Sequence, residues 1–284
     1  YSDSEKLYNQ ALKLRQAILG IQHPDFASTL NNLADLYRNQ GFYGDAEQVY
    51  LQALTLRREA LGEDHPDVAS SLNNLGVLYD YQGRLEEAEK LYNQALEMDK
   101  KLLGDEHPDI TARLSNLAGI YSKQGRYEEA EPLFYEVLRL DKKFFGEEHL
   151  FIATSLNNLA GFYDVQQRYQ EAEPLYRQAL ELYRKLLGNE HPNVALSLNN
   201  LAGLYEDQGQ TDQAAPLYLQ ALQQRQRILG KEHPDSIDTL RRLSNLYLNQ
   251  EKYPEAKTLM TMTSRFLSRF SVLTMRRLSP SPLA

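Results

Sequence analysis

Apolar residues recur at spacings of three and four along residues 65–106, and polar residues fill the positions between them. Leu72, Leu75 and Tyr79 belong to a wide apolar arc that is typical of a helix packed on more than one side. Pro66 suits the first turn of such a helix, where a missing N–H is no loss. The pattern therefore predicts a helix that begins near Pro66.

A second helical pattern runs from about Leu85 to Leu103. Gly83 separates the two patterns and Gly104 follows the second, because glycine readily takes the left-handed conformation that closes a helix. Ala88, a small residue, allows the backbones of two helices to approach closely. One unit is therefore predicted to be a hairpin of two antiparallel helices.

The same pattern returns every 42 residues along the chain. Four columns of identical residues mark it: His23, His65, His107, His149, His191 and His233; Leu30, Leu72, Leu114, Leu156, Leu198 and Leu240; Tyr37, Tyr79, Tyr121, Tyr163, Tyr205 and Tyr247; Ala46, Ala88, Ala130, Ala172, Ala214 and Ala256. A fixed period of this length signals stacked supersecondary units. A continuous coiled coil is excluded, because a glycine inside a helix costs about 1 kcal/mol and a proline about 3 kcal/mol.

The fold class expected from this period is all-α, a right-handed superhelical solenoid of antiparallel helix pairs. The register predicts the following segments: 1–22, the second helix of a truncated repeat; 23–64, 65–106, 107–148, 149–190 and 191–232, five complete repeats; 233–277, a sixth repeat with an atypical basic capping helix; 278–284, a disordered tail.

The composition is that of a soluble protein with a core, with 42% hydrophobic and 25% charged residues. No apolar run approaches the roughly 18 residues that cross a bilayer, so we expect no membrane association. The formal charge of -8 argues against nucleic acid as a partner, since phosphates attract a basic face. The absence of cysteine excludes disulfides and thiolate chemistry.

The residues that could carry catalysis or bind a metal do not converge. Zinc ligands must lie about 2 Å from one ion, whereas equivalent histidines of a repeat array are spread along its length. We expect the histidines to open the first helices, with an irregular junction at His149, which Leu150 follows in place of proline. Paired glutamates such as Glu86 and Glu87 are typical partners of a helix dipole. We therefore expect no enzyme, no metal and no cofactor.

The last part of the chain has a different charge. Residues 257–284 hold five basic residues and no acidic residue: Lys257, Arg265, Arg269, Arg276 and Arg277. The apolar positions Leu259, Met262, Phe266, Phe270 and Leu273 keep helical spacing, which favours an amphipathic capping helix. The alternative is intramolecular docking of this basic segment on the acidic body of its own chain, or self-association through a neighbouring molecule.

Seven columns together resemble a known signature: Leu75, Gly76, Tyr79, Gly83, Ala88, Tyr92 and Ala95. They are similar to the tetratricopeptide repeat, stretched from 34 to 42 residues, in the form found in kinesin light chains and related bacterial signalling proteins. The resemblance implies that the first helices line a concave groove which accepts extended peptide segments of cargo or client proteins. It also implies a cytoplasmic protein.

The most regular polar feature of the first helices is a row of asparagines, which we expect to contact such a peptide together with one apolar residue: Asn31, Asn32, Asn73, Asn74, Val77, Asn116, Asn157, Asn158, Asn199 and Asn200. An amide can bond both the N–H and the C=O of an extended chain without reading its side chains. The alternative is that one asparagine of each pair bonds the adjacent repeat or caps a backbone group.

Selectivity for the peptide is expected at positions that vary between repeats. Gly119, Gly161 and Gly203 share one such column, where they either leave room for a bulky ligand residue or allow tight helix packing. The function expected from the sequence is a peptide-binding adaptor. A structural or self-associating module of a larger multidomain signalling protein is the alternative.

Overall fold

The structure, a computed structural model, describes residues 2–264, which form helices and contain no strand. The chain divides into two compact units, Tyr1–Phe144 and Phe145–Ala284. The helices beginning in the first unit are α1 (Ser2–Leu19), α2 (Pro24–Asn39), α3 (Tyr43–Leu61), α4 (Pro66–Tyr81), α5 (Leu85–Leu103), α6 (Pro108–Lys123) and α7 (Tyr127–Phe145). Those of the second unit are α8 (Leu150–Val165), α9 (Tyr169–Leu187), α10 (Pro192–Asp207), α11 (Thr211–Ile228) and α12 (Pro234–Asn249), followed by helical residues 253–264.

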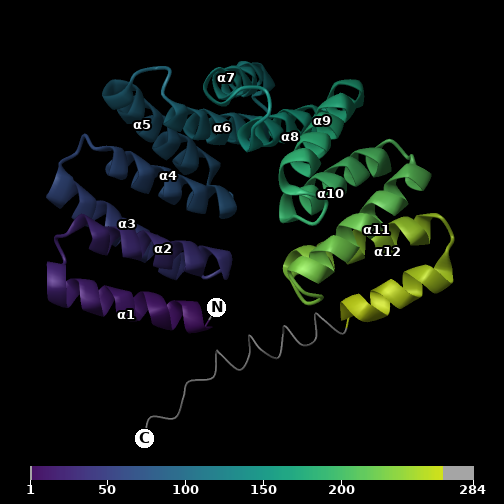
Figure 1. Ribbon diagram of the computed structural model, residues 1–284, viewed down its shortest axis with the longest axis horizontal. Helices are drawn as coiled ribbons and strands as arrows, with labels where there is room; N and C mark the ends of the chain where they lie inside the picture. The colour runs from purple at the N-terminus through teal and green to yellow at the C-terminus, as the bar shows by residue number, and fades with distance from the viewer. Residues whose placement is uncertain (1, 265–284) are drawn as a thin grey trace, which may run out of the picture. The chain divides into compact units, whose positions relative to one another are not determined.

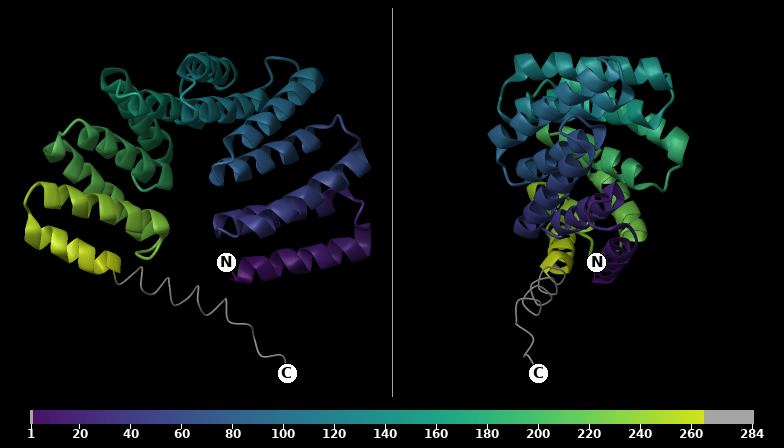
Figure 2. Two further views of the ribbon diagram at one scale, coloured as in Figure 1. Left: turned by 180° about the vertical axis from the view of Figure 1, so that it is seen from behind. Right: turned by 90° about the vertical axis from the view of Figure 1, so that its left-hand side faces the viewer.

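First and second helices alternate within each unit and lie side by side in chain order (Figures 1 and 2). The pairs α2 and α3, α4 and α5, α8 and α9, and α10 and α11 make the most extensive contacts, as expected for helical hairpins. No helix in residues 2–264 is long and apolar enough to cross a bilayer. Residues 265–284, which hold most of the expected capping helix and the expected tail, lie outside the described residues.

Each first helix from α2 to α12 begins with the same histidine cap. The histidine Nδ1 accepts a hydrogen bond from the backbone N–H two residues later, at 3.1 to 3.3 Å in all six cases. This bond satisfies one of the four N–H groups that a helix start leaves unpaired. His149 makes the same cap although Leu150 replaces proline, so the sequence change at this junction leaves the cap intact.

Residues in the left-handed conformation end the helices, as the glycine pattern predicts. Gly83 has φ 74° after α4, and Gly104 has φ 89° after α5. Gln167 and Glu251 occupy the column of Gly83 and take φ 60° and 59° without being glycines. Their strain, of order 1–2 kcal/mol each, is tolerated because the neighbouring helices fix the turn.

The core of the first unit is built around tyrosines of the second helices. Tyr50 and Tyr92 are fully buried between first and second helices, where they contact leucines and alanines of both. Gly76 lies directly against one of these rings: a Cβ atom placed on it would approach Cε1 of Tyr92 to 2.8 Å. The hairpin of α4 and α5 therefore depends on the absence of a side chain at Gly76.

Polar side chains set the register between consecutive hairpins. Arg57, near the end of α3, is buried and donates to the carbonyl oxygen of Asp67 at 2.9 Å and to the hydroxyl of Ser71 at 2.8 Å. Arg225 makes the equivalent bonds to Asp235 and Thr239 in the second unit. Burial lowers the pKa of both guanidinium groups.

The next junction of the first unit has an ion pair at the same two columns. Asp99 occupies the column of Arg57, and Arg113 occupies that of Ser71. The guanidinium of Arg113 donates to Asp99 Oδ2 at 3.0 Å. Burial raises the pKa of Asp99, and Arg113 opposes that shift. Each of these contacts joins a second helix to the first helix of the next repeat.

A second set of contacts joins the tyrosine column to the preceding hairpin. Tyr79 donates its hydroxyl to Glu47 at 2.9 Å, and Arg84 lies over the Tyr79 ring at 3.7 Å while bonding the same glutamate. Arg126 makes the corresponding contacts with Tyr121 and Glu89. An arginine after the first helix thus covers the tyrosine ring and pairs with a glutamate of the previous repeat.

The first prediction compares two glycines in neighbouring first helices. Alanine is about 1 kcal/mol more favourable than glycine inside a helix, but at Gly76 its methyl group would collide with the buried Tyr92 ring. We expect Gly76→Ala to lower the free energy of unfolding by roughly 1–3 kcal/mol. Gly119→Ala, which has nothing within 4 Å of the new methyl group, should be neutral or stabilising. Urea denaturation followed by circular dichroism measures both, and equal effects would contradict the packing argument.

The second prediction compares adjacent arginines of α3. Arg57→Ala removes the side-chain donor to the Asp67 carbonyl and the nearer of two donors to the buried Ser71 hydroxyl, which keeps only the longer bond from Asn31, so we expect a loss of about 1–3 kcal/mol. Arg58 pairs with Glu63 at the surface, and Arg58→Ala should cost less than about 1 kcal/mol. The two variants have the same charge, so denaturation midpoints isolate the buried contact. A loss for Arg57→Ala no larger than for Arg58→Ala would contradict it.

Candidate functional site

One face of the first helices stays open to solvent in both units. It is formed by four positions per helix at spacings of four, three and four residues, none of them buried. In α4 these are Ser70, Asn74, Val77 and Tyr81; in α8, Thr154, Asn158, Gly161 and Val165; in α10, Leu196, Asn200, Gly203 and Asp207. The equivalent positions of α2 and α6 are Ser28, Asn32, Asp35 and Asn39, and Ala112, Asn116, Gly119 and Lys123. We call these residues the first-helix face.

The first asparagine of three pairs lies beside this face and is buried. Asn31, Asn73 and Asn199 are 4%, 8% and 8% exposed. Asn31 donates its amide to the Ser71 hydroxyl at 3.3 Å, and Asn199 accepts from Thr239 at 3.2 Å. These amides therefore bond the next repeat, which is the alternative considered from the sequence, and little of their surface is left for a peptide.

The second asparagine of each pair belongs to the first-helix face. Asn32 is exposed, and Asn74, Asn116, Asn158 and Asn200 are half-buried. Two of them also bond backwards to the preceding repeat: Asn116 donates to Asn73 Oδ1 at 2.8 Å, and Asn200 donates to Asn157 Oδ1 at 3.1 Å. The asparagines thus form hydrogen-bonded steps between adjacent first helices, and half-buried Asn157 is one of these acceptors.

The glycine column lies in the middle of the face. A Cβ atom on Gly119 would meet nothing within 4 Å, and one on Gly161 or Gly203 would lie 3.4 or 3.5 Å from a tyrosine hydroxyl. These are ordinary contacts, so tight helix packing does not require glycine there. Val77 occupies the same column in α4 and packs partly against the core. The face therefore has room above α6, α8 and α10.

Carboxylates on or beside the first-helix face differ in their partners between the two units. Asp35 accepts from Tyr50 and pairs with Arg38 at 3.0 Å. Asp80 pairs with Lys123 at 2.5 Å. In the first unit, each of these two carboxylates has a cation beside it.

In the second unit Asp164 occupies the column of Asp80, and Asp207 occupies that of Lys123. Tyr176 donates to Asp164 at 3.3 Å. Burial, reinforced by the like charge of Asp207, raises the pKa of Asp164 to about 6. Two carboxylates thus stand where the first unit has an ion pair.

Two exposed apolar residues of this face are not among those predicted from the sequence. Val165 is 65% and Leu196 is 44% exposed, and Leu196 lies one turn before Asn200. Each is an apolar residue in a column that is otherwise mostly polar. The column of Val165 holds Tyr81, Lys123 and Asp207 in other repeats, and the column of Leu196 holds Ser28, Ser70 and Thr154. They are easily overlooked because a single exposed apolar residue is common on any protein surface.

Comparison with solved structures places the chain among helical repeat proteins. BtubC (BKLC) from P. vanneervenii is 25% identical with a TM-score of 0.65, over 84% of this chain and 94% of that one. A Podosopora anserina putative kinesin light chain with nearly identical TPR-like repeats is 29% identical with a TM-score of 0.56, over 72% and 97% of the two chains.

A Rap protein complexed with Competence and Sporulation Factor has a TM-score of 0.60 at 15% identity, over 94% of this chain and 86% of that one, which shows the fold alone. No curated protein matches the chain.

Family models described as tetratricopeptide repeat match residues 25–101, 109–164, 151–225 and 197–267, and a further one matches residues 1–25. These ranges cover most of the chain. The all-α tetratricopeptide fold expected from the sequence, and its similarity to kinesin light chain-type repeats, are thereby confirmed. The chain belongs to the tetratricopeptide repeat family.

Proposed function

We propose that this chain is a protein-interaction scaffold, rather than an enzyme, and that it holds extended peptide segments of partner proteins on the first-helix face. The observation that carries the proposal is the repetition of an accessible amide on consecutive first helices, Asn32 and Asn74 in one unit and Asn158 and Asn200 in the other. Such amides supply a donor and an acceptor to a peptide backbone. The proposed setting is the cytoplasm, as for a cargo or client adaptor.

The proposed contacts are narrower than the set expected from the sequence. The proposed peptide contacts are the residues whose side chains are partly accessible: Asn32, Asn74, Asn116, Asn157, Asn158, Asn200 and Val77. Asn31, Asn73 and Asn199 would act indirectly, since they bond the neighbouring repeat. Buried amides of this kind fix the spacing of the first helices and with it the spacing of the exposed amides.

Two carboxylates, Asp207 of the face and Asp164 beside it, also favour a ligand-binding role. The negative charge of Asp207 adds to burial in raising the pKa of Asp164. A cation in place of either residue would remove this repulsion. Groups placed where they cost stability are typical of functional surfaces. The exposed Leu196 on the same face would add apolar contact to a bound segment.

A self-associating module is the second candidate, and an apolar stripe of helix α1 is the surface at which it can be tested. Leu7, Leu14 and Ile18 form one stripe of α1 and are 64%, 62% and 76% exposed. Leu56 of α3, which occupies the same column as Leu14, packs against the core. Association of two copies through this stripe would bury it. Docking of the basic segment from Lys257 onwards stays a prediction, because most of that segment lies outside the described residues.

The third prediction separates these candidates. A displayed panel of random peptides is selected against the chain, and the best peptide is titrated by fluorescence anisotropy. We expect Asn32→Ala combined with Asn74→Ala to weaken binding at least tenfold, because two backbone anchors are lost. Gln52→Ala, an exposed position of α3, is the control and should change nothing. If no peptide is selected and Leu14→Glu abolishes self-association, the scaffold proposal is wrong and the second candidate stands.

The fourth prediction concerns pH. With a pKa near 6, Asp164 in the folded chain retains a proton between pH 4 and 6 that the unfolded chain releases. Stability therefore falls as pH rises through this interval. We expect Asp164→Asn to raise the free energy of unfolding at pH 7 by about 1 kcal/mol, after allowance for solvent screening, and to change it little at pH 4. Asp80→Asn, which removes a partner of Lys123, should give no gain. Urea midpoints at both pH values test this; equal gains at pH 4 and 7 would contradict it.

A further inference from the structure

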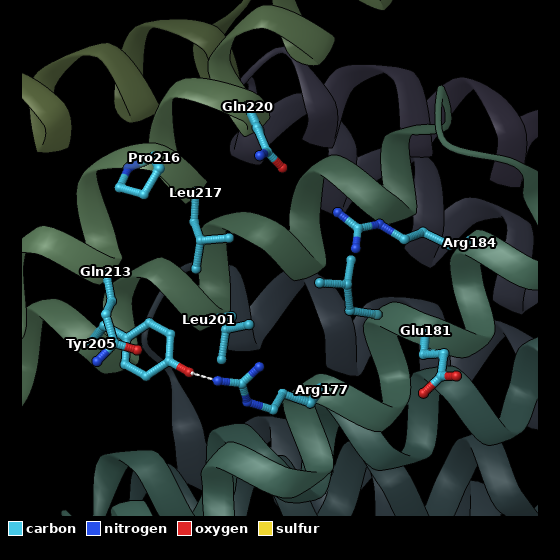
Figure 3. A pocket seen from close by; sticks show the side chains of 10 residues that line it. Arg177, Glu181, Arg184, Leu201, Tyr205, Gln213, Pro216, Leu217 and Gln220 are labelled. Atoms are coloured by element: carbon cyan, nitrogen blue, oxygen red, sulfur yellow. Dashed lines mark hydrogen bonds between the residues drawn. The ribbon is translucent and has the colours of Figure 1, made fainter.

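A crevice opens in the second unit between α9 and α11, with α10 as its floor (Figure 3). Its volume is about 620 Å³. Leu180, Leu201 and Leu217 give it an apolar lining, one from each of the three helices. It therefore offers space for an apolar side chain between two second helices.

The crevice lies on the opposite side of α10 from the first-helix face. Leu201 and Tyr205 line it, whereas Gly203 belongs to that face. Side chains advance by about 100° per residue in a helix, so position 203 points roughly opposite to positions 201 and 205. A ligand in the crevice would leave the first-helix face accessible.

A departure from the repeat pattern lies beside the crevice. Residue 210 is glutamine, where Arg84 and Arg126 of earlier repeats cover a tyrosine ring. Gln210 bonds Gln208 and Gln213 instead. No guanidinium from position 210 therefore covers Tyr205.

Arg177, from the preceding second helix, takes over part of that role. Its Nε donates to Glu173 at 2.9 Å and its Nη2 donates to the Tyr205 hydroxyl, as Figure 3 shows. No hydrogen bond from Nη1 is recorded within the described part of the chain. One edge of the guanidinium thus stays available at the wall of the crevice.

Arg184 supplies a second cation on the same wall. It is exposed and has no ion pair among the residues that the structure describes. Glu181 lies between the two arginines along α9 and also lines the crevice. The α9 wall therefore presents two guanidinium groups, with one carboxylate between them, beside an apolar lining.

We propose that this crevice is a second docking site, for a partner-protein segment in which carboxylates flank an aliphatic side chain. Arg177 and Arg184 are seven residues apart, or about 10 Å along α9. A polyproline II segment covers about 9 Å in three residues and returns its side chains to the same side every third residue. The segment that fits has two acidic residues three positions apart, with a leucine-sized residue between them that enters the lining of Leu180, Leu201 and Leu217.

The test uses fluorescein-labelled nonapeptides with the central sequence Glu-Leu-Ala-Glu and matched peptides with Gln-Leu-Ala-Gln, titrated against the whole chain by anisotropy. We expect the acidic peptide to bind at least tenfold more tightly than the neutral one. Arg184→Glu should weaken it at least tenfold, and Gln210→Arg several-fold, because an arginine at 210 would cover Tyr205. Thermal melting by circular dichroism confirms that each variant is folded.

Lys185→Glu is the matched control, because it makes the same change of charge one residue later, on a lysine that pairs with Glu148 at the repeat junction. It should leave binding unchanged. Equal weakening by Arg184→Glu and Lys185→Glu, or no preference for the acidic peptide, would overturn the proposal. Loss of binding on combining Asn158→Ala with Asn200→Ala would also overturn it by placing the peptide on the first-helix face. Failure of the crevice leaves the proposed function of that face intact.

Discussion

A buried polar contact between the end of a second helix and the start of the next first helix is the constraint that fixes the arrangement at the α3–α4, α5–α6 and α11–α12 junctions. Apolar packing holds helices together but does not fix how far one slides along the other. Arg57 and Arg225 remove that freedom, because each must reach one carbonyl and one hydroxyl of the following helix. An unsatisfied buried guanidinium is costly, so other registers are excluded.

The amides beside the first-helix face depend on the same register. Asn31 and Asn199 bond the residue that the buried arginine also holds, Ser71 in one unit and Thr239 in the other. A shared partner couples the two contacts, so a shift of one helix would break both. The accessible asparagines are therefore presented at a spacing set by buried chemistry rather than by the ligand.

The sequence predicted the helices almost to the residue, because their limits are set by local chemistry. Histidine caps, the proline at the first turn and glycines with positive φ act over four or five residues, and α4 and α5 begin and end where Pro66, Gly83, Leu85 and Gly104 indicate. The division into two units was not predicted. It depends on contacts between elements rather than on any local pattern.

The site was predicted less completely, for a physical reason. Two successive asparagines differ by 100° around the helix, and the apolar arc of these helices is too wide to show which one faces the neighbour. The crevice was missed although Gln210 carried a signal in the arginine column. A crevice between three helices forms where side chains of neighbouring helices do not contact each other. The hydrophobic pattern of a single helix does not show where such contacts are absent.

The ion pair of Asp99 and Arg113 limits how such a chain can change its length. Recombination between similar repeats readily deletes or duplicates one of them. Excision of residues 65–106 would join α3 to α6 and place Arg57 beside Arg113, two cations in a buried site made for opposite or neutral partners. The Asp99–Arg113 pair therefore opposes loss of this repeat, because Arg113 would then lie beside another cation. It does so even though the repeat closely resembles the others.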